Sequence, residues 1–179
     1  AIEYVRNNKI PFLGICLGMQ LSVIEGARNV LKLKDASSTE FGETKNPIIA
    51  LLTEWIKGDE KEKRGFDADK GASMRLGAYP CNITPNTLAY MLYGKEQITE
   101  RHRHRYEVNM NYKKSLEDNG YLFSGMSPDG MLPEIVEYRG HPYFIACQFH
   151  PELISRPFKP HPLFVGLFKA VLERKKAAA

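Results

Sequence analysis

The chain has 179 residues, of which 43% are hydrophobic and 26% are charged, as in an ordinary globular domain with its own core. No apolar run approaches the roughly 18 residues that a membrane span requires, and the opening residues do not have the pattern of a signal peptide. The formal net charge is +4 at pH 7, with part of the positive charge in the terminal "ERKKAAA". The charge therefore gives little support for nucleic-acid binding.

The three cysteines, Cys16, Cys81 and Cys147, are an odd number at wide spacings. This pattern predicts neither a disulfide framework nor a zinc site, so we expect no metal in this chain and a reducing, cytoplasmic setting. The first residue is Ala1 rather than methionine, and the first segment has helical spacing that leads straight into a strand. We therefore expect the chain to be part of a longer polypeptide.

The first 31 residues alternate between helical and strand-like patterns. "AIEYVRNN" (1–8) has apolar residues at helical spacing, "PFLGI" (11–15) is a short apolar run, and "LGMQLSVIEGARNVL" (17–31) returns to helical spacing. A short, wholly apolar strand is typical of a sheet that is covered on both faces. This alternation predicts an α/β fold with a doubly wound, mostly parallel sheet flanked by helices.

The next stretch is more polar. Residues 32–46 are predicted to form a loop, 48–52 a strand, and 72–83 a second strand with loosely alternating apolar positions. Between these strands, "KGDEKEKRGFDADKG" (57–71) is mostly charged and carries few large apolar groups. Such a segment cannot bury enough surface to order itself, so we expect it to be a mobile loop.

Helices and strands alternate again in the second half of the chain. "NTLAYMLYG" (86–94) is predicted to be a helix capped by Asn86, and residues 98–109 an extended segment. A helix is expected at 111–120, and an amphipathic helix at 162–176 closes the chain. Between these two helices lie three predicted strands separated by turns, at 121–127, 133–138 and 143–149.

The sequence "GICLG" (14–18) places a cysteine between two glycines at a predicted strand-to-helix junction. This G-x-C-x-G pattern has the spacing of the nucleophile elbow, where a sharp turn lifts the central side chain off the end of the strand. Gly14 and Gly18 would leave room for that turn. The start of the helix would favour a thiolate at Cys16 and offer the Leu17 N–H to an oxyanion. A small hydrophobic residue packed in a strand is the alternative interpretation of Cys16.

A nucleophilic cysteine needs a base, and "ACQFHPEL" (146–153) offers one. His150 ends an apolar run, so it is expected at the carboxyl end of a strand, where sites form in open α/β sheets. Glu152 lies two residues later, and in an extended segment both side chains point the same way. Alone, the pair fits an ordinary exposed strand end. Together with the cysteine motif it predicts a triad of Cys16, His150 and Glu152.

In "RHRHR" (101–105), an extended chain puts the three arginines on one face and the two histidines on the other. The arginines fit either a solvated basic edge or a site that captures a carboxylate or phosphate. The remaining candidates are interpreted as structural, namely His141 and His161 beside prolines, and Cys81 and Cys147 without a base nearby in the sequence.

These motifs occur together in a known family. "PFLGICLGMQ" (11–20), followed far downstream by "QFHPE" (148–152), resembles the class I (triad-type) glutamine amidotransferases. The resemblance runs from residue 1 to about residue 172 and implies the doubly wound fold of that class. It narrows to the glutaminase domain of the CTP synthase family on four further stretches, "STEF", "MRLG", "ERHRHRYEVN" and "SRPFKPHP".

The resemblance implies a glutaminase. Cys16 is expected to attack the side-chain amide of glutamine, giving a γ-glutamyl thioester and ammonia, while His150 moves the proton and Glu152 orients the imidazole. In chemical terms, Glu40 can accept from the substrate α-ammonium and Arg105 can support its carboxylate end. The glutamine-binding residues implied by the family are Leu17, Gly18, Met19, Gln20, Glu40 and Arg105.

The resemblance also implies partners for the domain. Ammonia is expected to pass to a synthetase domain of the same polypeptide, which uses ATP and magnesium to aminate UTP to CTP. GTP is expected to activate the glutaminase step near "ASMRLGAYP" (72–80), and the family forms cytoplasmic homotetramers through the synthetase domain. For the domain itself we expect no cofactor, nucleic acid or membrane.

The synthetase domain, and the glycine-rich oxyanion strand that the family carries before this point, have no counterpart in the sequence. Residues 1–179 are therefore interpreted as an N-terminally incomplete amidotransferase domain whose sheet lacks its first strands.

Two other classes of protein remain compatible with the sequence. One is another cysteine hydrolase, such as a γ-glutamyl hydrolase, because the triad alone does not exclude it. The other is a non-catalytic module that binds phosphates or nucleic acid through "RHRHR", which predicts steep salt dependence and indifference to Cys16. Gln20, Glu40 and Arg105 together favour free glutamine over a peptide.

Overall fold

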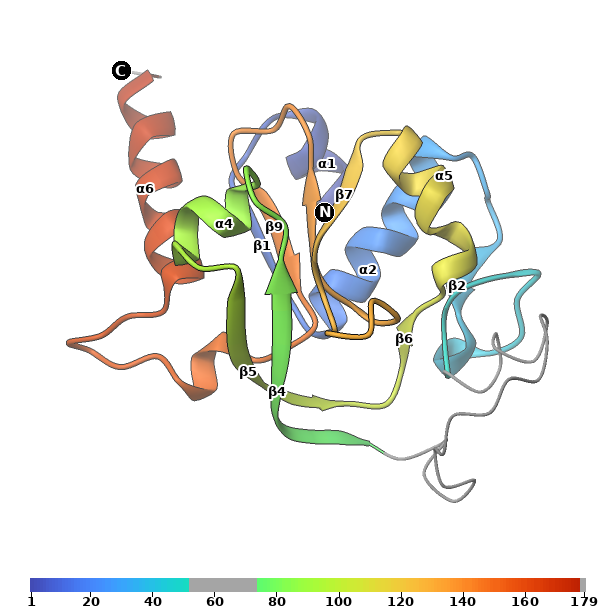
Figure 1. The fold of residues 1–179 in the computed structure, drawn as a ribbon. Coiled ribbons are helices and arrows are strands. Elements are labelled where there is room, and N and C mark those ends of the chain that lie inside the picture. The colour runs from blue at the N-terminus through green and yellow to red at the C-terminus, as the bar shows by residue number, and fades with distance from the viewer. Residues whose placement is uncertain (52–73, 178–179) are drawn as a thin grey trace.

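The computed structural model describes residues 1–51 and 74–177, whose strands form two sheets (Figure 1). The larger sheet has six strands in the order β1-β9-β8-β7-β4-β5, and the smaller sheet has three in the order β2-β3-β6. The strands are β1 (Phe12–Ile15), β2 (Ala36–Ser38), β3 (Asn46–Ala50), β4 (Arg75–Ile83), β5 (Gln97–His104), β6 (Glu107–Val108), β7 (Tyr121–Met126), β8 (Pro133–Tyr138) and β9 (Phe144–Cys147).

Five α-helices and four shorter helical turns connect the strands of the described ranges. The α-helices are α1 (Ile2–Asn7), α2 (Leu17–Glu25), α4 (Leu88–Tyr93), α5 (Lys113–Asp118) and α6 (Pro162–Ala177). The shorter turns are the π-helical η1 (Gly26–Val30) and the 3-10 turns η2 (Thr39–Phe41), η4 (Met110–Tyr112) and η5 (Pro151–Leu153). Within the same ranges, no helix combines the length and apolarity needed to cross a membrane.

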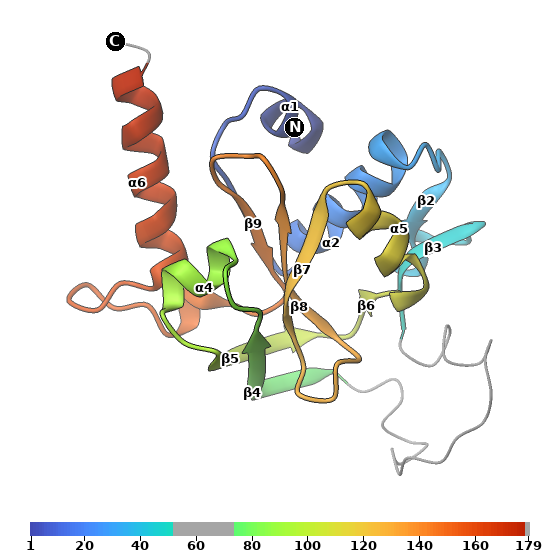
Figure 2. The same ribbon diagram turned by 45° about the horizontal axis from the view of Figure 1, so that its top comes forward.

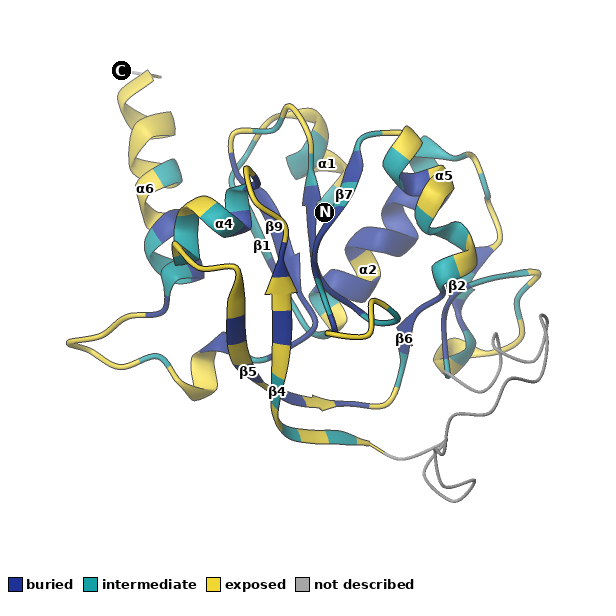
Figure 3. Cartoon of the chain, in the orientation of Figure 1, coloured by how far each residue is buried: buried dark blue, intermediate teal, exposed yellow. Residues whose placement is uncertain are grey.

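Helices cover both faces of the larger sheet, with α2 and α5 on one side and α4 and α6 on the other (Figures 1 and 2). Successive residues of β9 therefore pack into two different cores. Phe144 and Ala146 belong to the cluster that includes the buried face of α2, whereas Ile145 and Cys147 belong to the cluster with α4 and α6. Burial on both sides makes the centre of the sheet dark in Figure 3 and confirms the predicted α/β class.

The described sheet is mixed rather than mostly parallel. β1 and β9 pair in parallel, with Ile15 opposite Cys147, whereas the remaining pairs of the larger sheet are antiparallel. The connections at 127–132 and 139–143 explain the difference, because they are too short for the crossover that parallel strands require. Both turns lie where the sequence predicts them, and each makes the two strands that it joins antiparallel.

A long ribbon of β4 and β5 carries the arginine-histidine alternation. The two strands pair from Arg75 opposite His104 to Asn82 opposite Gln97, and burial along β5 alternates at every residue. His102 and His104 therefore face inward and the neighbouring arginines face outward, so the two residue types lie on opposite faces as the sequence predicts. The ribbon brings one face of β5 against the interior and leaves the other at the surface.

Two local expectations are corrected by the structure. Thr87, not Asn86, caps α4, because its hydroxyl accepts the Tyr90 N–H at 3.1 Å, while Asn86 has a left-handed φ of 62°. The polar stretch 32–46 contains β2 and η2 in addition to loop, because pairing with β3 orders a strand that local sequence does not indicate. The charged segment 57–71, expected to be mobile, lies outside the described residues.

Candidate active site

Cys16 lies in the turn between β1 and α2. Its N–H donates to Cys147 O at 2.8 Å and extends the β1–β9 ladder by one residue. Its φ of 51° and ψ of −104° form a conformation that residues other than glycine rarely adopt. Such a conformation costs about 1–3 kcal/mol and persists only where the surrounding structure imposes it. The strain has the location and form expected of a nucleophile elbow.

Only one of the two flanking glycines is required by the space around it. A Cβ added to Gly14 would lie 2.8 Å from Ala146 Cβ and from the backbone carbonyl of Gly18. A Cβ added to Gly18 would meet nothing within 4 Å. Glycine is therefore needed at position 14, where the strand approaches the start of the helix, and the expectation that Gly18 also makes room for the turn is wrong.

His150 follows β9, the parallel partner of β1. Its Nδ1 lies 2.6 Å from Glu152 Oε1, and its Nε2 is buried without a hydrogen-bond partner among the described residues. Because the carboxylate only accepts, the proton of the neutral imidazole lies on Nδ1 and the lone pair on Nε2. The 3-10 turn η5, which begins at Pro151, brings the Glu152 carboxylate to the His150 ring. The sequence predicted an extended segment here.

A cavity of about 250 Å³ opens beside Cys16. Its side chains come from three separate parts of the sequence, because the start of α2, the turn η2 and the link between β5 and β6 meet there. The lining residues are Cys16, Leu17, Gln20, Glu40, Arg103, His104, Arg105 and Tyr106. A carboxylate and two guanidinium groups in one small cavity offer both signs of charge, which suits a zwitterionic ligand.

The structure brings most of the predicted site residues together. Cys16, Leu17, Gln20, Glu40 and Arg105 all line the cavity. The other two predicted glutamine-binding residues and the His-Glu pair do not, namely Gly18, Met19, His150 and Glu152.

Met19 instead lies fully buried in the core beneath α2. Any part that Gly18 and Met19 play in the site is therefore through the backbone of the turn. His150 and Glu152 follow β9, as Cys16 follows β1, and residues that follow two parallel strands lie at the same edge of the sheet.

Comparison with known proteins decides the family. The model of the class-I glutamine amidotransferases matches residues 1–170, nearly the whole chain. The chain belongs to the class-I glutamine amidotransferase family. This amidotransferase chain is 56% identical over 176 residues to the CTP synthases of Methylobacterium radiotolerans and Bartonella tribocorum. Each alignment covers 98% of the chain and 32% of the relative, so the chain spans less than half the length of these curated relatives.

Solved structures agree with the family. The glutaminase domain of Trypanosoma brucei CTPS with bound acivicin is 34% identical, with a TM-score of 0.84 over 96% of this chain and 64% of that chain. A putative GMP synthase protein from Thermoplasma acidophilum is 16% identical, with a TM-score of 0.55 over 99% of this chain and 65% of that chain. At that identity the second likeness concerns the fold alone.

Three residues of the amidotransferase cavity were not expected there, namely Arg103, His104 and Tyr106. A signal for two of them exists in the sequence, since "RHRHR" leads directly to Arg105. The end of β5 brings its last residues to the cavity together, whichever face each one occupies. Alternation of residue types along a strand indicates which face each side chain occupies. It does not indicate which other element the end of the strand meets.

The surroundings of Cys16 in this amidotransferase favour the thiol over the thiolate. Burial raises the pKa of Cys16 above its ordinary value, and the carboxylates of Glu107 and Glu152 raise it further. The Leu17 N–H and the Gln148 amide act in the opposite direction without cancelling the effect of burial. At neutral pH Cys16 therefore rests as a thiol, and formation of a thiolate at this position requires a base.

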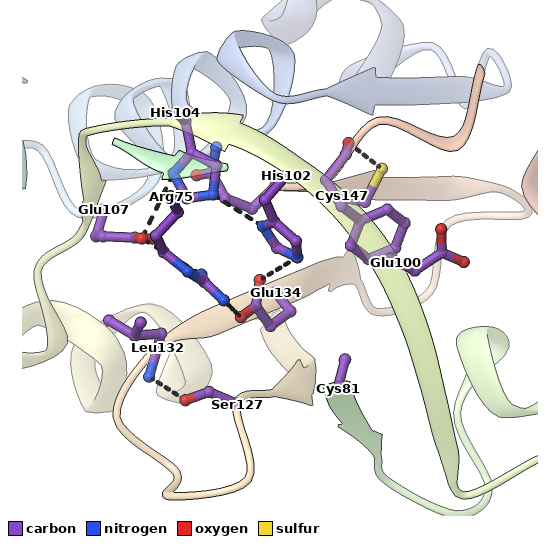
Figure 4. Close-up of polar contacts among 12 residues, drawn as sticks. Arg75, Cys81, Glu100, His102, His104, Glu107, Ser127, Leu132, Glu134 and Cys147 are labelled. Carbon is purple, nitrogen blue, oxygen red and sulfur yellow. Dashed lines mark hydrogen bonds and ion pairs between the residues drawn. The ribbon is translucent and has the colours of Figure 1, made fainter. Parts of the chain in front are cut away.

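A buried polar cluster lies behind the cavity wall (Figure 4). Arg75 binds Glu134 at 2.8 Å and Glu107 at 3.4 Å, and His102 Nδ1 lies 2.9 Å from His104 Nε2. Burial lowers the pKa of His102 to about 2 and that of His104 to about 3. Burial also raises the pKa of Glu107 to about 8. The histidines are therefore neutral over the physiological range.

The residues interpreted as structural lie where that interpretation places them. His161 Nε2 is 2.9 Å from Glu100 Oε1, and His141 Nε2 is 3.2 Å from Val5 O. Cys81 and Cys147 are fully buried in the cluster with α4 and α6. Within residues 1–51 and 74–177, no three histidine, cysteine, aspartate or glutamate side chains come together as a ligand set for a metal ion.

Proposed function

We propose that the chain hydrolyses the side-chain amide of L-glutamine, with Cys16 as nucleophile, His150 as base and acid, and Glu152 as the group that orients the imidazole. The observation that carries the proposal is the strained Cys16 in the lining of a cavity that Glu40 and Arg105 also line. The His150–Glu152 contact of 2.6 Å, on the segment that follows the neighbouring strand, supplies the rest of a triad.

The first half-reaction forms a thioester. His150 Nε2 takes the proton of the Cys16 thiol as Sγ bonds to the side-chain carbonyl carbon of glutamine. The oxygen becomes an oxyanion, for which the Leu17 N–H is a donor because the first N–H groups of α2 lack intrahelical acceptors. The C–N bond then breaks, His150 returns the proton to the nitrogen, and ammonia leaves.

The second half-reaction restores the enzyme. A water molecule attacks the γ-glutamyl thioester carbon while His150 takes its proton, and the C–S bond breaks to release glutamate. The proton returns to the Cys16 sulfur, so the sum is glutamine and water giving glutamate and ammonia. Glu152 stabilises the imidazolium each time it forms, because its Oε1 lies on the Nδ1 side of the ring.

The size and charges of the cavity support the proposed recognition of a free amino acid. Pockets for drug-sized ligands occupy about 300–1,000 Å³, and this cavity is smaller at about 250 Å³. Glu40 accepts the α-ammonium group and Arg105 supports the α-carboxylate, which places the amide end toward Cys16. The backbone of Leu17, Gly18 and Met19 and the side chain of Gln20 complete the proposed glutamine site.

The role of the ammonia is proposed from the relatives. Because CTP synthases align with 98% of the chain, we assign it to the amidotransferase domain of such an enzyme. The proposal places ATP- and magnesium-dependent amination of UTP, and assembly into homotetramers, on a synthetase domain of the same polypeptide. GTP is the proposed activator, acting near residues 72–80.

Labelling with an electrophilic glutamine analogue tests the proposed glutaminase. Acivicin, the compound bound to the Trypanosoma brucei relative, is expected to modify Cys16, and free glutamine is expected to block the modification. Peptide mass spectrometry locates the adduct. Cys16→Ser is expected to abolish it, whereas Cys81→Ala, at a buried site outside the cavity, is expected to retain it.

The alternatives give different labelling patterns. Modification of Cys16 that glutamine does not block would indicate another cysteine hydrolase, such as a γ-glutamyl hydrolase. The absence of any modification at Cys16 would favour a non-catalytic binding module, whose ligand binding would weaken steeply with salt.

A further inference from the structure

Gln148 is a fully buried amide that the proposed mechanism does not use. It directly follows β9 and lies between two residues of the cavity. Its Nε2 is 3.7 Å from Cys16 Sγ, and its Oε1 is 3.2 Å from Gln20 Nε2. A buried polar side chain needs partners for its donors and acceptors, and here one of those partners is the proposed nucleophile.

A backbone carbonyl fixes the orientation of both amides. Tyr106 O can only accept, and it lies 3.0 Å from the side-chain nitrogen of Gln20, so this atom is the amide NH2. The same NH2 donates to Gln148 Oε1, which leaves the NH2 of Gln148 facing Cys16. Flipping the Gln148 amide would set two donors against each other at Gln20. The group that points at the sulfur is therefore a donor.

The Tyr106 carbonyl is held from its other side by the buried cluster. His104 Nδ1 lies 3.2 Å from Tyr106 O and must carry the proton, so its Nε2 accepts from His102 Nδ1 at 2.9 Å. His102 Nε2 lies 3.6 Å from Glu134 Oε2 without a hydrogen bond between them, whereas the other oxygen of Glu134 binds Arg75 at 2.8 Å (Figure 4). Hydrogen bonds thus run from His102 through His104 and the Tyr106 carbonyl to the two glutamine amides beside Cys16.

The geometry points to Gln148 as a positioning residue that donates a hydrogen bond to the Cys16 thiolate and stabilises it relative to the thiol. The inference deepens the proposed function and rests on it, since the thiolate is the attacking species of that mechanism. The donor is in place before the proton leaves, because Gln20 and Tyr106 already fix it. A donor that needs no rearrangement acts on the charged state without an added cost of reorganisation.

Opposing influences act on the pKa of Cys16, and the Gln148 amide is one of them. Burial, Glu107 and Glu152 raise the pKa of Cys16, whereas the Leu17 N–H and the Gln148 amide lower it. The Leu17 N–H belongs to the backbone and persists in every variant. Gln148 is thus a side chain whose replacement removes one donor from the sulfur and leaves the other in place.

The test measures the pKa of Cys16 in the 179-residue chain from the pH dependence of alkylation by iodoacetamide. Peptide mass spectrometry follows the adduct at Cys16 alone. Gln148→Leu removes the donor, and Gln148→Met removes it while keeping the approximate length of the side chain and adding no charge. Both variants are expected to raise the pKa of Cys16 by about one unit, with about tenfold slower alkylation below that pKa.

Gln97→Leu is the matched control, because it removes an exposed amide whose partner is Asn82. Its Cys16 pKa is expected to equal that of the parent. Circular dichroism and thermal unfolding establish which variants fold, and Gln148→Met, whose side chain is close in size to that of glutamine, decides the matter if Gln148→Leu does not fold. An unchanged or lower Cys16 pKa in a folded Gln148 variant overturns the inference. The pKa measurement uses no glutamine, so its result does not depend on glutamine binding. Failure of the glutaminase proposal would appear instead in the acivicin labelling.

Discussion

At the scale of single residues, the site depends on a strained backbone and on how closely two elements approach. Cys16 adopts a φ of 51°, and its N–H still extends the ladder between β1 and β9 at 2.8 Å. The conformation persists because the strand on one side and α2 on the other leave the chain no alternative path. Gly14 permits that approach, since a side chain there would meet the carbonyl of Gly18 and the side chain of Ala146.

Alanine substitutions at the two glycines test this difference. Gly14→Ala is expected to lower the free energy of unfolding by roughly 1–3 kcal/mol, because the new methyl group would lie 2.8 Å from atoms of Ala146 and Gly18. Gly18→Ala is expected to be neutral or to stabilise by up to about 1 kcal/mol, since it gains helix propensity and meets no atom. Urea unfolding measures both, and equal destabilisation by the two variants would contradict the assignment.

At the scale of elements, β4, β5, β6 and β8 enclose charged groups behind the wall of the cavity. Arg75 on β4 joins Glu134 on β8 to Glu107 on β6, and His102 and His104 on β5 complete the cluster. Burial favours the protonated form of Glu107, because the cost of removing its charge from water outweighs the attraction of the Arg75 guanidinium. The elements thus trap a titratable group inside the fold.

The pH dependence of stability is expected to report Glu107. Its pKa is about 8 in the folded chain against an ordinary 4.5, so between these values only the folded chain holds the proton. The free energy of unfolding then falls as pH rises, by at most about 1.4 kcal/mol per pH unit. His102 and His104, with folded pKa values of about 2 and 3, give the opposite slope only below their ordinary 6.5. The slope of the free energy of unfolding between pH 6.5 and 8 therefore reports mainly the titration of Glu107, not that of the histidines.

Glu107→Gln is expected to flatten the slope in that interval, because the amide does not titrate. Glu117→Gln, at the partly exposed ion pair with Lys113, is expected to leave the slope as it is in the parent. Urea unfolding at several pH values measures the effect, and a parental slope in Glu107→Gln would contradict the account of the cluster.

At the scale of the whole molecule, the larger sheet separates two hydrophobic cores. The cavity lies where the start of α2, the smaller sheet and the β4–β5 ribbon meet. The α2 face of the sheet contributes Cys16 and Gln20, the smaller sheet leads into Glu40, and the β4–β5 ribbon leads into Arg105. The opposite face packs against α4 and α6, neither of which lines the cavity. Substitutions on that face are therefore expected to change the free energy of unfolding without changing the lining of the cavity.

Side-chain truncations in α6 test how the far face is held. Leu163→Ala is expected to lower the free energy of unfolding by about 2–5 kcal/mol, because Leu163 is fully buried in the cluster with Tyr143 and Phe149. Phe168→Ala, in the same helix, is expected to change it by no more than about 0.5 kcal/mol, since Phe168 is 68% exposed. Thermal or urea unfolding measures both, and comparable losses would show that α6 is bound by a different face.

The sequence alone determined the features that depend on neighbours in the chain. Apolar periodicity predicted β1, β9 and α2, because a buried face repeats at the period of its element. The alternation in "RHRHR" predicted that the arginines and histidines of β5 lie on opposite faces, and G-x-C-x-G predicted a sharp turn at Cys16. The family followed from the same motifs, because they are short and local.

Tertiary structure decided the features that depend on distant partners. Strand direction was set by connection length, the strand β2 by pairing with β3, and the cap of α4 by the geometry of Thr87. The cavity joins Arg103, His104 and Tyr106 to Cys16 through the register of β4 and β5, which no local pattern encodes. Gln148 begins the "QFHPE" motif, but the motif does not indicate that its amide faces Cys16. Only packing against Gln20 turns its donor toward the sulfur, because a side-chain amide takes the orientation that its buried partners impose.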